Sequence, residues 1–266
     1  FFFAPALPAG AGDAGMRHLM FDWEVSMELK EFFRSCPRAA LAFSGGTDSA
    51  YLLYAAREYG CNVRAYYVHT AFQPAFELAD AKRLAAELGA PLTVLEADIL
   101  ACPQVAANPP DRCYHCKRAL FTRLWQAARA DGYEVLLDGT NASDDASDRP
   151  GMRALGELSV RSPLRECGIT KGEVRERSRQ AGLFTWDKPA YACLATRVPA
   201  GTPITAEDLR KVEAAEDLLF QKGFTDFRVR LFHGAARIQL PRRQMERALF
   251  LRYDLLEALS PLFDGV

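Results

Sequence analysis

The sequence Leu-Ala-Phe-Ser-Gly-Gly-Thr-Asp-Ser at residues 41–49 constrains the fold more than any other feature of the chain. The apolar run 39–43 predicts a buried strand, the two glycines predict a turn, and residues 50–58 predict a helix. A strand, a glycine turn and a helix N-terminus bring free backbone N–H groups and a positive dipole end to one point. The segment therefore predicts a phosphate-binding loop.

The residue types in this loop suit an anion site better than a turn that only starts a helix. Glycines let the backbone approach an anion closely, and the hydroxyl groups can donate further hydrogen bonds. A carboxylate is unexpected in an anion site, so we predict that Asp48 binds Mg²⁺ or orients a partner group. No G-x-x-x-x-G-K-[ST] run is present, so this is not a Walker loop. The pattern instead resembles the loop of the ATP pyrophosphatases, and the candidate ATP-binding residues are Ser44, Gly45, Gly46, Thr47, Asp48 and Ser49.

The composition is that of an ordinary globular protein of one or two domains, with 266 residues of which 49% are hydrophobic. A net charge of −1 provides no overall field for nucleic acid, and no apolar stretch reaches the roughly 18 residues of a membrane helix. Seven cysteines, an odd number in a long chain, favour free thiols in the cytoplasm over a disulfide scaffold. We expect a cytoplasmic protein that acts on a small molecule, without a nucleic-acid or membrane partner. Residues 1–19 are expected to lie outside the folded protein.

Strands and helices alternate over residues 20–198, which predicts an α/β domain with a parallel sheet and helices on both faces. Ligands of such sheets bind beyond the carboxyl ends of the strands. The sequence Asp-Gly-Thr-Asn at 138–141 follows a predicted strand, so we expect Gly139, Thr140 and Asn141 at the same edge as the loop. Predicted strands cover 39–43, 63–68, 92–95 and 135–138, and helices 50–58, 74–88 and 111–130.

The pattern changes after a Pro-containing linker at 198–203. Thr205 is placed to cap a helix over 206–222, and two short strands at 227–231 and 235–240 flank a His-Gly pair that predicts a hairpin. Residues 199–266 are therefore expected to form a small α+β domain.

Cys113 and Cys116 form a C-x-x-C motif at the start of a predicted helix, where the dipole favours thiolates. Such a motif fits a redox pair, half of a zinc site or half of an iron–sulfur site. No second C-x-x-C exists, and Cys193, in an irregular stretch, is the candidate partner. Among the other cysteines, Cys36 and Cys61 are expected to be packing residues, while Cys102 and Cys167 stay unassigned.

Several segments together resemble the LarE family, ATP-dependent sulfur transferases that build the nickel-pincer nucleotide of lactate racemase. They are residues 44–49, 138–145, 148–151, 162–164 and 189–197. The resemblance implies an adenine nucleotide alpha hydrolase-like fold. It also implies that ATP adenylates a carboxylate of pyridinium-3,5-biscarboxylic acid mononucleotide and that sulfur then displaces AMP to leave a thiocarboxylate.

The resemblance also implies a sulfur source. Family members with three matching cysteines use them to hold a [4Fe–4S] cluster whose fourth iron carries a sulfide. By this resemblance, Cys113, Cys116 and Cys193 are the expected catalytic cluster ligands of this chain. ATP and Mg²⁺ are the other expected cofactors. The alternatives are a sacrificial Cys193 that gives up its own sulfur, and a zinc site completed by His115 or another cysteine.

Basic residues are the candidates for binding the substrate. Arg228 and Arg230 alternate on one predicted strand and so share a face. The resemblance implies that they bind the phosphate or a carboxylate of the substrate, with Glu216 nearby, whereas the alternative is a solvated strand face. Arg149 and Arg197 lie in matching motifs and are expected to face the crevice.

Other functions fit parts of the pattern. A tRNA thiolase would use the same loop and three cysteines, but would typically carry extra zinc-binding cysteine pairs and a basic face. In an amide-forming ATP pyrophosphatase such as NAD synthetase, the cysteines would have no role in the reaction. An ATP-binding iron–sulfur sensor would bind the nucleotide but release no pyrophosphate. The resemblance implies a homo-oligomer. The sequence does not specify which nickel-pincer enzyme is the client.

Overall fold

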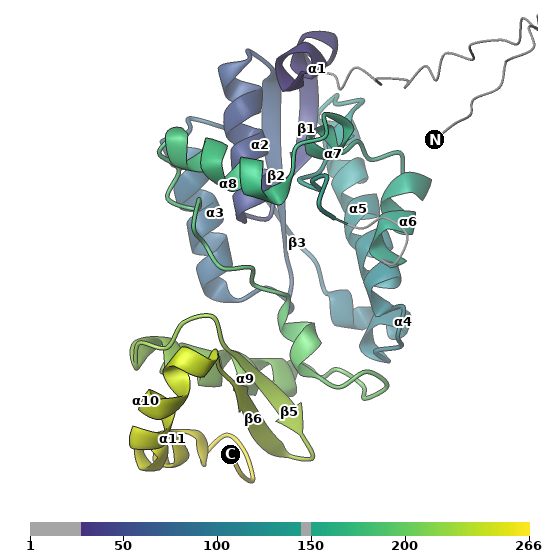
Figure 1. Cartoon of the computed structure of the whole chain (residues 1–266). Coiled ribbons are helices and arrows are strands. Elements are labelled where there is room, and N and C mark those ends of the chain that lie inside the picture. The colour runs from purple at the N-terminus through teal and green to yellow at the C-terminus, as the bar shows by residue number, and fades with distance from the viewer. Residues whose placement is uncertain (1–27, 145–149) are drawn as a thin grey trace, which may run out of the picture.

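The computed structural model of the chain describes residues 28–144 and 150–266, so the predicted non-native segment 1–19 lies outside the described residues. Four parallel strands form the main sheet in the order β3-β2-β1-β4 (Figure 1). The strands are β1 Arg38–Ala42, β2 Asn62–His69, β3 Leu92–Glu96 and β4 Leu136–Leu137. The predicted parallel α/β sheet is confirmed.

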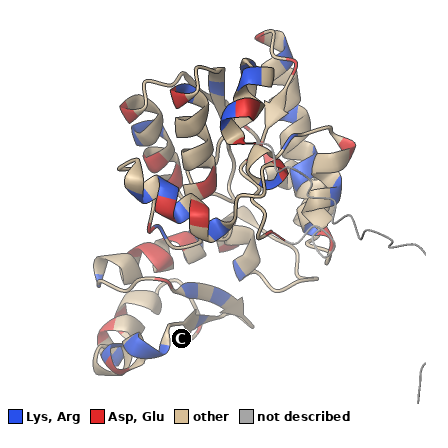
Figure 2. Cartoon of the chain, turned by 45° about the horizontal axis from the view of Figure 1, so that its top comes forward, with Lys and Arg blue, Asp and Glu red and all other residues tan. Residues whose placement is uncertain are grey.

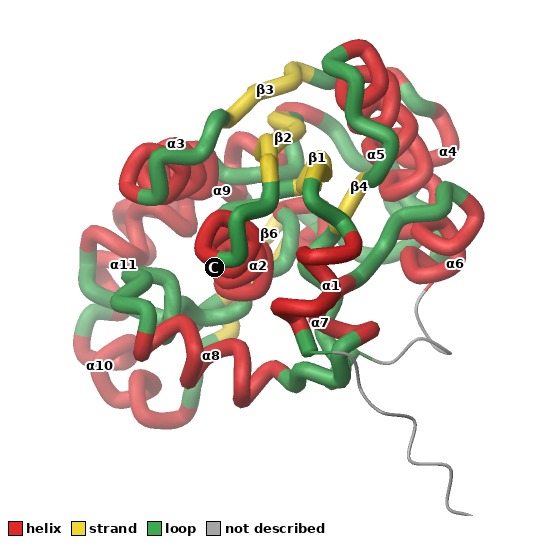
Figure 3. The backbone as a smooth tube through the Cα atoms, turned by 90° about the horizontal axis from the view of Figure 1, so that it is seen from above, coloured by secondary structure: helices red, strands yellow, loops and turns green. Residues whose placement is uncertain are grey.

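Helices cover both faces of this sheet, with α2 and α3 on one face and α5 on the other (Figure 3). Alternate residues of β1 make the two contacts: Leu41 packs with the α2 side, and Ala40 packs with Leu124 and Trp125 of α5. The helices of this part are α1 Leu29–Ser35, α2 Thr47–Glu58, α3 Ala75–Glu87, α4 Pro103–Ala106, α5 Arg112–Ala130, α6 Pro150–Glu157, α7 Pro163–Glu166 and α8 Lys171–Gln180, with short 3₁₀ turns η1 Ile99–Ala101 and η2 Leu194–Arg197.

The strand order reverses at β1, so that the segments after β1 and β4 leave the same edge of the sheet. The chain runs outward from β1 through β2 to β3, then crosses back to place β4 on the other side of β1. Loops that leave neighbouring strands in opposite directions open a ligand site between them. The loop after β1 and the 138–141 segment after β4 both start at this point, as predicted.

The C-terminal part has its own apolar cluster around a two-stranded antiparallel sheet, β5 Arg228–Phe232 and β6 Ala235–Gln239. His233 and Gly234 both have positive φ, 51° and 81°, which matches the right-handed twist of a two-residue hairpin. The Thr205 side chain accepts from Asp208 N and caps α9, as predicted. The remaining elements are α9 Ala206–Gln221, η3 Arg242–Gln244, α10 Met245–Phe250 and α11 Arg252–Leu259.

The two parts meet through a shared apolar cluster in which Phe72 and Leu194 pack with Leu209 and Val212 of α9. The boundary after residue 198 stays a prediction. Figure 2 shows acidic and basic side chains interspersed over the helices, with a run of basic residues on the β5–β6 sheet. Within the described ranges, no helix combines the length and apolar character needed to cross a bilayer.

Candidate active site

The loop after β1 has the backbone geometry of an anion site. Gly45 has a φ of 70°, and a Cβ there would lie 3.1 Å from the Cβ of Ala81, so the loop is packed tightly against α3. Gly46 is the N-cap of α2 and has no side chain to satisfy the first-turn amides. Helix α2 begins at Thr47, earlier than the predicted residue 50, because the extended Gly46 serves as its N-cap and the helix starts directly after the glycine turn. The positive end of α2 therefore lies directly at the loop.

The loop hydroxyl groups also hold the loop together. Ser44 Oγ and Ser49 Oγ are 3.0 Å apart, and Ser44 N donates to Ser49 Oγ at 3.3 Å. Thr47 Oγ1 donates to the carbonyl of Thr185 at 2.9 Å, which anchors the loop to the segment after α8. Thr47 thus uses its hydroxyl proton within the protein, and Ser44 is the hydroxyl at the edge of the cavity.

Asp48 is held by two partners. Its Oδ2 lies 2.6 Å from Nζ of Lys171, the first residue of α8, and its Oδ1 accepts from Asn141 Nδ2 at 3.3 Å. To serve as the predicted Mg²⁺ ligand, Asp48 would have to exchange the ammonium group for the ion. Sequence reasoning missed Lys171, because no local spacing relates it to a loop 123 residues away.

The 138–141 segment packs against the start of α2, at Asp48 and Ser49. A Cβ on Gly139 would lie 2.8 Å from Ser49 N, so only glycine lets the segment pass this close to α2. Buried Asp138 accepts from Thr140 Oγ1 at 2.5 Å, and Thr140 and Asn141 are themselves buried. Gly139, Thr140 and Asn141 do not line the cavity described below, and their contact with the nucleotide stays a prediction.

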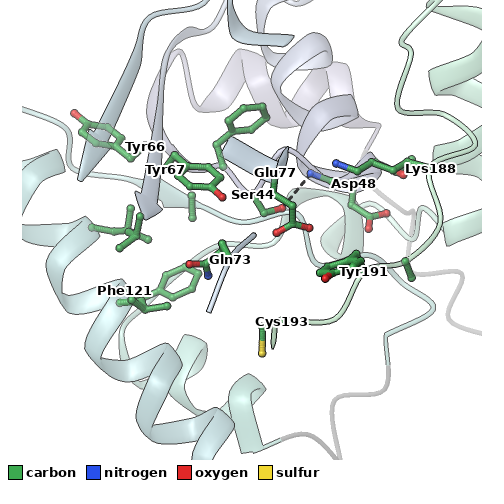
Figure 4. Close-up of a pocket in the computed structure, with 18 of the residues that line it drawn as sticks. Ser44, Asp48, Tyr66, Tyr67, Gln73, Glu77, Phe121, Lys188, Tyr191 and Cys193 are labelled. Carbon is green, nitrogen blue, oxygen red and sulfur yellow. Dashed lines mark hydrogen bonds between the residues drawn. The ribbon is translucent and has the colours of Figure 1, made fainter. Parts of the chain in front are cut away.

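A cavity of about 400 Å³ extends from the loop to Cys193 (Figure 4). Ser44, Thr47 and Asp48 line it at one end, and apolar side chains of α5, among them Phe121, line another side. This size suits a small-molecule ligand. An anion-binding loop and a thiol therefore share one cavity.

The predicted cysteine trio comes from two segments that pack together. Cys116 on α5 and Cys193, the residue before η2, both pack against the apolar cluster that joins the two parts of the protein. Buried Arg112 ties the segments, since its Nη1 donates to the Ala195 carbonyl at 2.7 Å and its Nη2 lies 3.7 Å from the Cys113 sulfur. All three cysteines are free thiols.

The predicted thiolate character is wrong for Cys116. Burial raises the pKa of the Cys116 thiol to about 12, and the neighbouring Cys193 adds to this. Burial also raises the pKa of Cys193, against the lowering effect of Arg112. Desolvation outweighs the helix end because these side chains face apolar neighbours rather than water.

The described residues offer no ready-made site for a single ion. Over 28–144 and 150–266, no three Cys, His, Asp or Glu side chains are placed to hold a metal ion. His115, the alternative zinc ligand, lies 3.4 Å from Asp111. Cys36 and Cys61 are buried in the main core as predicted, and Cys167 joins them, whereas Cys102 packs on the same apolar cluster as Cys116.

Arg197 and Glu216 form a buried ion pair, with Nε–Oε1 at 2.7 Å and Nη2–Oε2 at 3.0 Å. The Tyr191 hydroxyl donates a hydrogen bond to the Glu216 carboxylate, and Val229 N donates a second one to the same carboxylate at 2.9 Å. Both charges are satisfied within the protein. In this structure they join the Cys193 segment to α9 and β5, and their predicted contact with the substrate stays a prediction.

The two strand arginines also contact the Cys193 segment. Arg228 donates to the Ala190 carbonyl, and Arg230 donates to the Thr196 carbonyl. Neither lines the cavity that reaches Cys193, so the predicted substrate contacts are absent from this arrangement of the described residues. Arg149 lies outside the described residues.

Three cavity residues escaped sequence reasoning. Lys188, ion-paired with Asp80 at 2.7 Å, comes from the segment before Cys193. Tyr67 lies on β2 and Glu77 in the first turn of α3. A glutamate in a first helical turn ordinarily complements the helix dipole, so its position in the sequence gave no signal of a site.

The parallel sheet, its switch point and the glycine loop define an α/β protein of the PP-loop type. No family model matches the chain. The chain is 40% identical over 223 residues to an uncharacterized protein of Synechocystis, covering 82% of each. It is 31% identical over 217 residues to an uncharacterized protein of Methanocaldococcus jannaschii, again 82% of each.

A further relative is the pyridinium-3,5-bisthiocarboxylic acid mononucleotide synthase of Lactiplantibacillus plantarum. This chain is 35% identical to it over 206 residues, which is 77% of this chain and 75% of the synthase. The chain therefore belongs to the LarE family.

Proposed function

We propose that this protein uses ATP to replace carboxylate oxygen by sulfur in pyridinium-3,5-biscarboxylic acid mononucleotide, as a step in nickel-pincer cofactor synthesis. The observation that carries the proposal is the single cavity that joins the glycine loop to Cys193. The name of the L. plantarum relative supports the substrate class. AMP and pyrophosphate are the expected products.

The loop would stabilise the leaving pyrophosphate. A carboxylate oxygen is a poor leaving group, whereas AMP on an acyl adenylate is a good one, so ATP activates the substrate. The free first-turn amides of α2 and the ammonium groups of Lys171 and Lys188 supply positive charge at the cavity. Mg²⁺ would be held by Asp48 together with phosphate oxygens.

The three cysteines suit a [4Fe–4S] cluster as a donor set. Cys113, Cys116 and Cys193 are free and come from two segments tied by Arg112, and the thiols of Cys113 and Cys193 lie close enough to Cys116 to raise its pKa. When bound, the cluster would supply a sulfide to the activated carbonyl carbon. The protein's own part is to hold the acyl adenylate beside these thiols and to keep water out with the apolar side chains of α5.

An anaerobic turnover experiment tests the proposal. With ATP, Mg²⁺ and inorganic sulfide supplied, we expect pyrophosphate release that depends on the pyridinium dicarboxylate nucleotide, a thiolated product over several turnovers, and an unchanged polypeptide mass. Cys193→Ser should abolish sulfur transfer, whereas Cys167→Ser, a change at a buried thiol in the main core, should not.

Two other results would redirect the assignment. A mass loss equal to H₂S at Cys193, stoichiometric with product, would make Cys193 the sacrificial donor. Absence of pyrophosphate release with this substrate would refute the proposed function. The homo-oligomer and the cytoplasmic location stay predictions, and light scattering of the purified protein checks the first.

A further inference from the structure

The cavity is lined by a carboxyl group, that of Glu77, for which the proposed function above names no role. Glu77 projects from the first turn of α3 into the space between Ser44 and Tyr191 (Figure 4). Its position lies between the predicted phosphate loop and Cys193. Any substrate that spans the two must pass it.

Charge pairing around the cavity leaves Glu77 unmatched. Asp48 is paired with Lys171 at 2.6 Å, and Lys188 is paired with Asp80 at 2.7 Å. Within the described residues, Glu77 has neither an ion pair nor a hydrogen bond, and it is the one charged residue lining the cavity without such a partner. Glu77 is partly buried, and the two cations nearest to it, Lys188 and Arg197, are already ion-paired with other carboxylates, so its carboxylate favours a further cation from outside.

The pKa of Glu77 agrees with this geometry. Burial raises it to about 7, with Asp80 adding to the rise while Lys188 and Arg197 oppose it. The group therefore holds its proton in the empty site more tightly than an exposed glutamate does. A cation bound beside it would reverse this and favour the carboxylate.

A second unsatisfied group stands next to Glu77. The Tyr67 side chain is 1% exposed and lines the cavity, yet its hydroxyl has no hydrogen-bond partner in the described part of the chain. Burial raises the pKa of Tyr67, and the charge of Glu77 raises it further, so the phenol remains a hydrogen-bond donor. Buried donors are almost always satisfied, so this hydroxyl indicates a polar ligand atom at this wall.

We propose that Glu77 is the counter-charge to the pyridinium ring of the substrate and that the Tyr67 hydroxyl donates to an oxygen of the same ligand. This inference rests on the proposed function and deepens it. Glu77 would then be a specificity-determining residue that selects a cationic ring over a neutral aromatic dicarboxylate.

An organic cation suits this wall better than Mg²⁺ does. Aromatic Tyr67 and Tyr191 flank Glu77, and a weakly hydrated ring cation gains from aromatic faces as well as from the carboxylate (Figure 4). Mg²⁺ instead keeps several waters and prefers phosphate oxygens, and Asp48 at the loop is the carboxylate near which those would lie.

Binding measurements with two ligands test the inference. The protein is saturated with Mg²⁺ and a non-hydrolysable ATP analogue, then titrated with the pyridinium dicarboxylate mononucleotide or with its neutral benzene C-nucleotide analogue. The unmodified protein should prefer the cationic ligand by about tenfold, since one nearby charge pair in a partly solvated site is worth at least that factor. Glu77→Gln should remove the preference, and the matched control Glu87→Gln, on an exposed face of α3, should retain it.

Each other result has a defined meaning. Tyr67→Phe should weaken both ligands by a similar factor, and unchanged affinities would refute the role of its hydroxyl. If Glu77→Gln leaves the preference intact, or mainly raises the Mg²⁺ concentration needed for pyrophosphate release, the pyridinium assignment is wrong. Equal affinity of the unmodified protein for both ligands refutes this inference alone, whereas failure to bind either ligand, together with no pyrophosphate release when ATP replaces the analogue, refutes the proposed function with it.

Discussion

Removing the Glu216 charge should strongly destabilise the protein. The carboxylate accepts from Arg197 Nε at 2.7 Å, from Arg197 Nη2 at 3.0 Å and from Val229 N at 2.9 Å. The side chains of Arg197 and Glu216 are 0% and 2% exposed, so water cannot replace a lost partner. Breaking such a pair leaves an uncompensated buried charge, at a cost of about 3–5 kcal/mol.

Urea unfolding of Glu216→Gln, Arg197→Met and the double variant measures this cost. Each single variant should lose about 3–5 kcal/mol of unfolding free energy. The double variant should lose clearly less than the sum of the two, because removing both charges leaves no buried ion. The control Glu207→Gln breaks the exposed Glu207–Lys211 pair, 2.8 Å apart, and should change nothing measurable.

Two outcomes would refute this reasoning. One is that Glu216→Gln unfolds at the same urea concentration as the unmodified protein, and the other is that the double variant loses the full sum of the two single losses. Either result would mean that water or another group compensates the remaining charge and that the pair does not hold the Cys193 segment to the C-terminal part.

Three further predictions concern the loop and the cavity. Gly139→Ala places a Cβ 2.8 Å from Ser49 N, so the loop must shift. We expect the free energy of unfolding to fall by about 1–3 kcal/mol and nucleotide binding, measured by calorimetry, to weaken. Unchanged nucleotide affinity would contradict the close approach. Glu77 has its pKa raised from 4.5 to about 7, so the ligand-free protein should lose stability as pH rises through this window, because the folded state holds the proton more tightly. Glu77→Gln should therefore be more stable than the unmodified protein by up to about 3 kcal/mol near about pH 8 and equal to it near about pH 4, and equal urea midpoints at the higher pH would count against the buried carboxyl. Lys171→Met removes the cation beside Asp48 at 2.6 Å, so kcat/KM for pyrophosphate release should fall; an unchanged value would mean that Lys171 is not needed at the loop.

Much of the architecture was predictable because the signals are local. The strand, glycine turn and helix around residues 41–58 require only neighbouring residues to specify them, as do the Thr205 cap and the His233–Gly234 hairpin. Even there the predicted start of α2 was three residues late, because the turn that begins the helix depends on the packing of Gly45 against Ala81 of α3 as well as on the residues beside it.

Site roles were harder to predict because they depend on pairing. Arg197 and Glu216 carry charges that suit a substrate, and only the tertiary structure shows that each satisfies the other. Cys116 lies at a helix start, which favours a thiolate, yet the neighbours packed around it raise its pKa to about 12. Desolvation is set by what surrounds a group in space, and the sequence near that group does not contain this information.

The sequence by itself therefore determined the class of fold, the phosphate loop and the residues that resemble the LarE family, since all of these are patterns along the chain. Only the tertiary structure decided that Gly139 packs against the loop, that Asp48 is held by Lys171, and that the Glu77 side chain lines the cavity with no hydrogen bond or ion pair to another described residue. The physical reason is that charge compensation and burial arise between residues brought together by folding, and the Asp48–Lys171 pair spans 123 residues of chain.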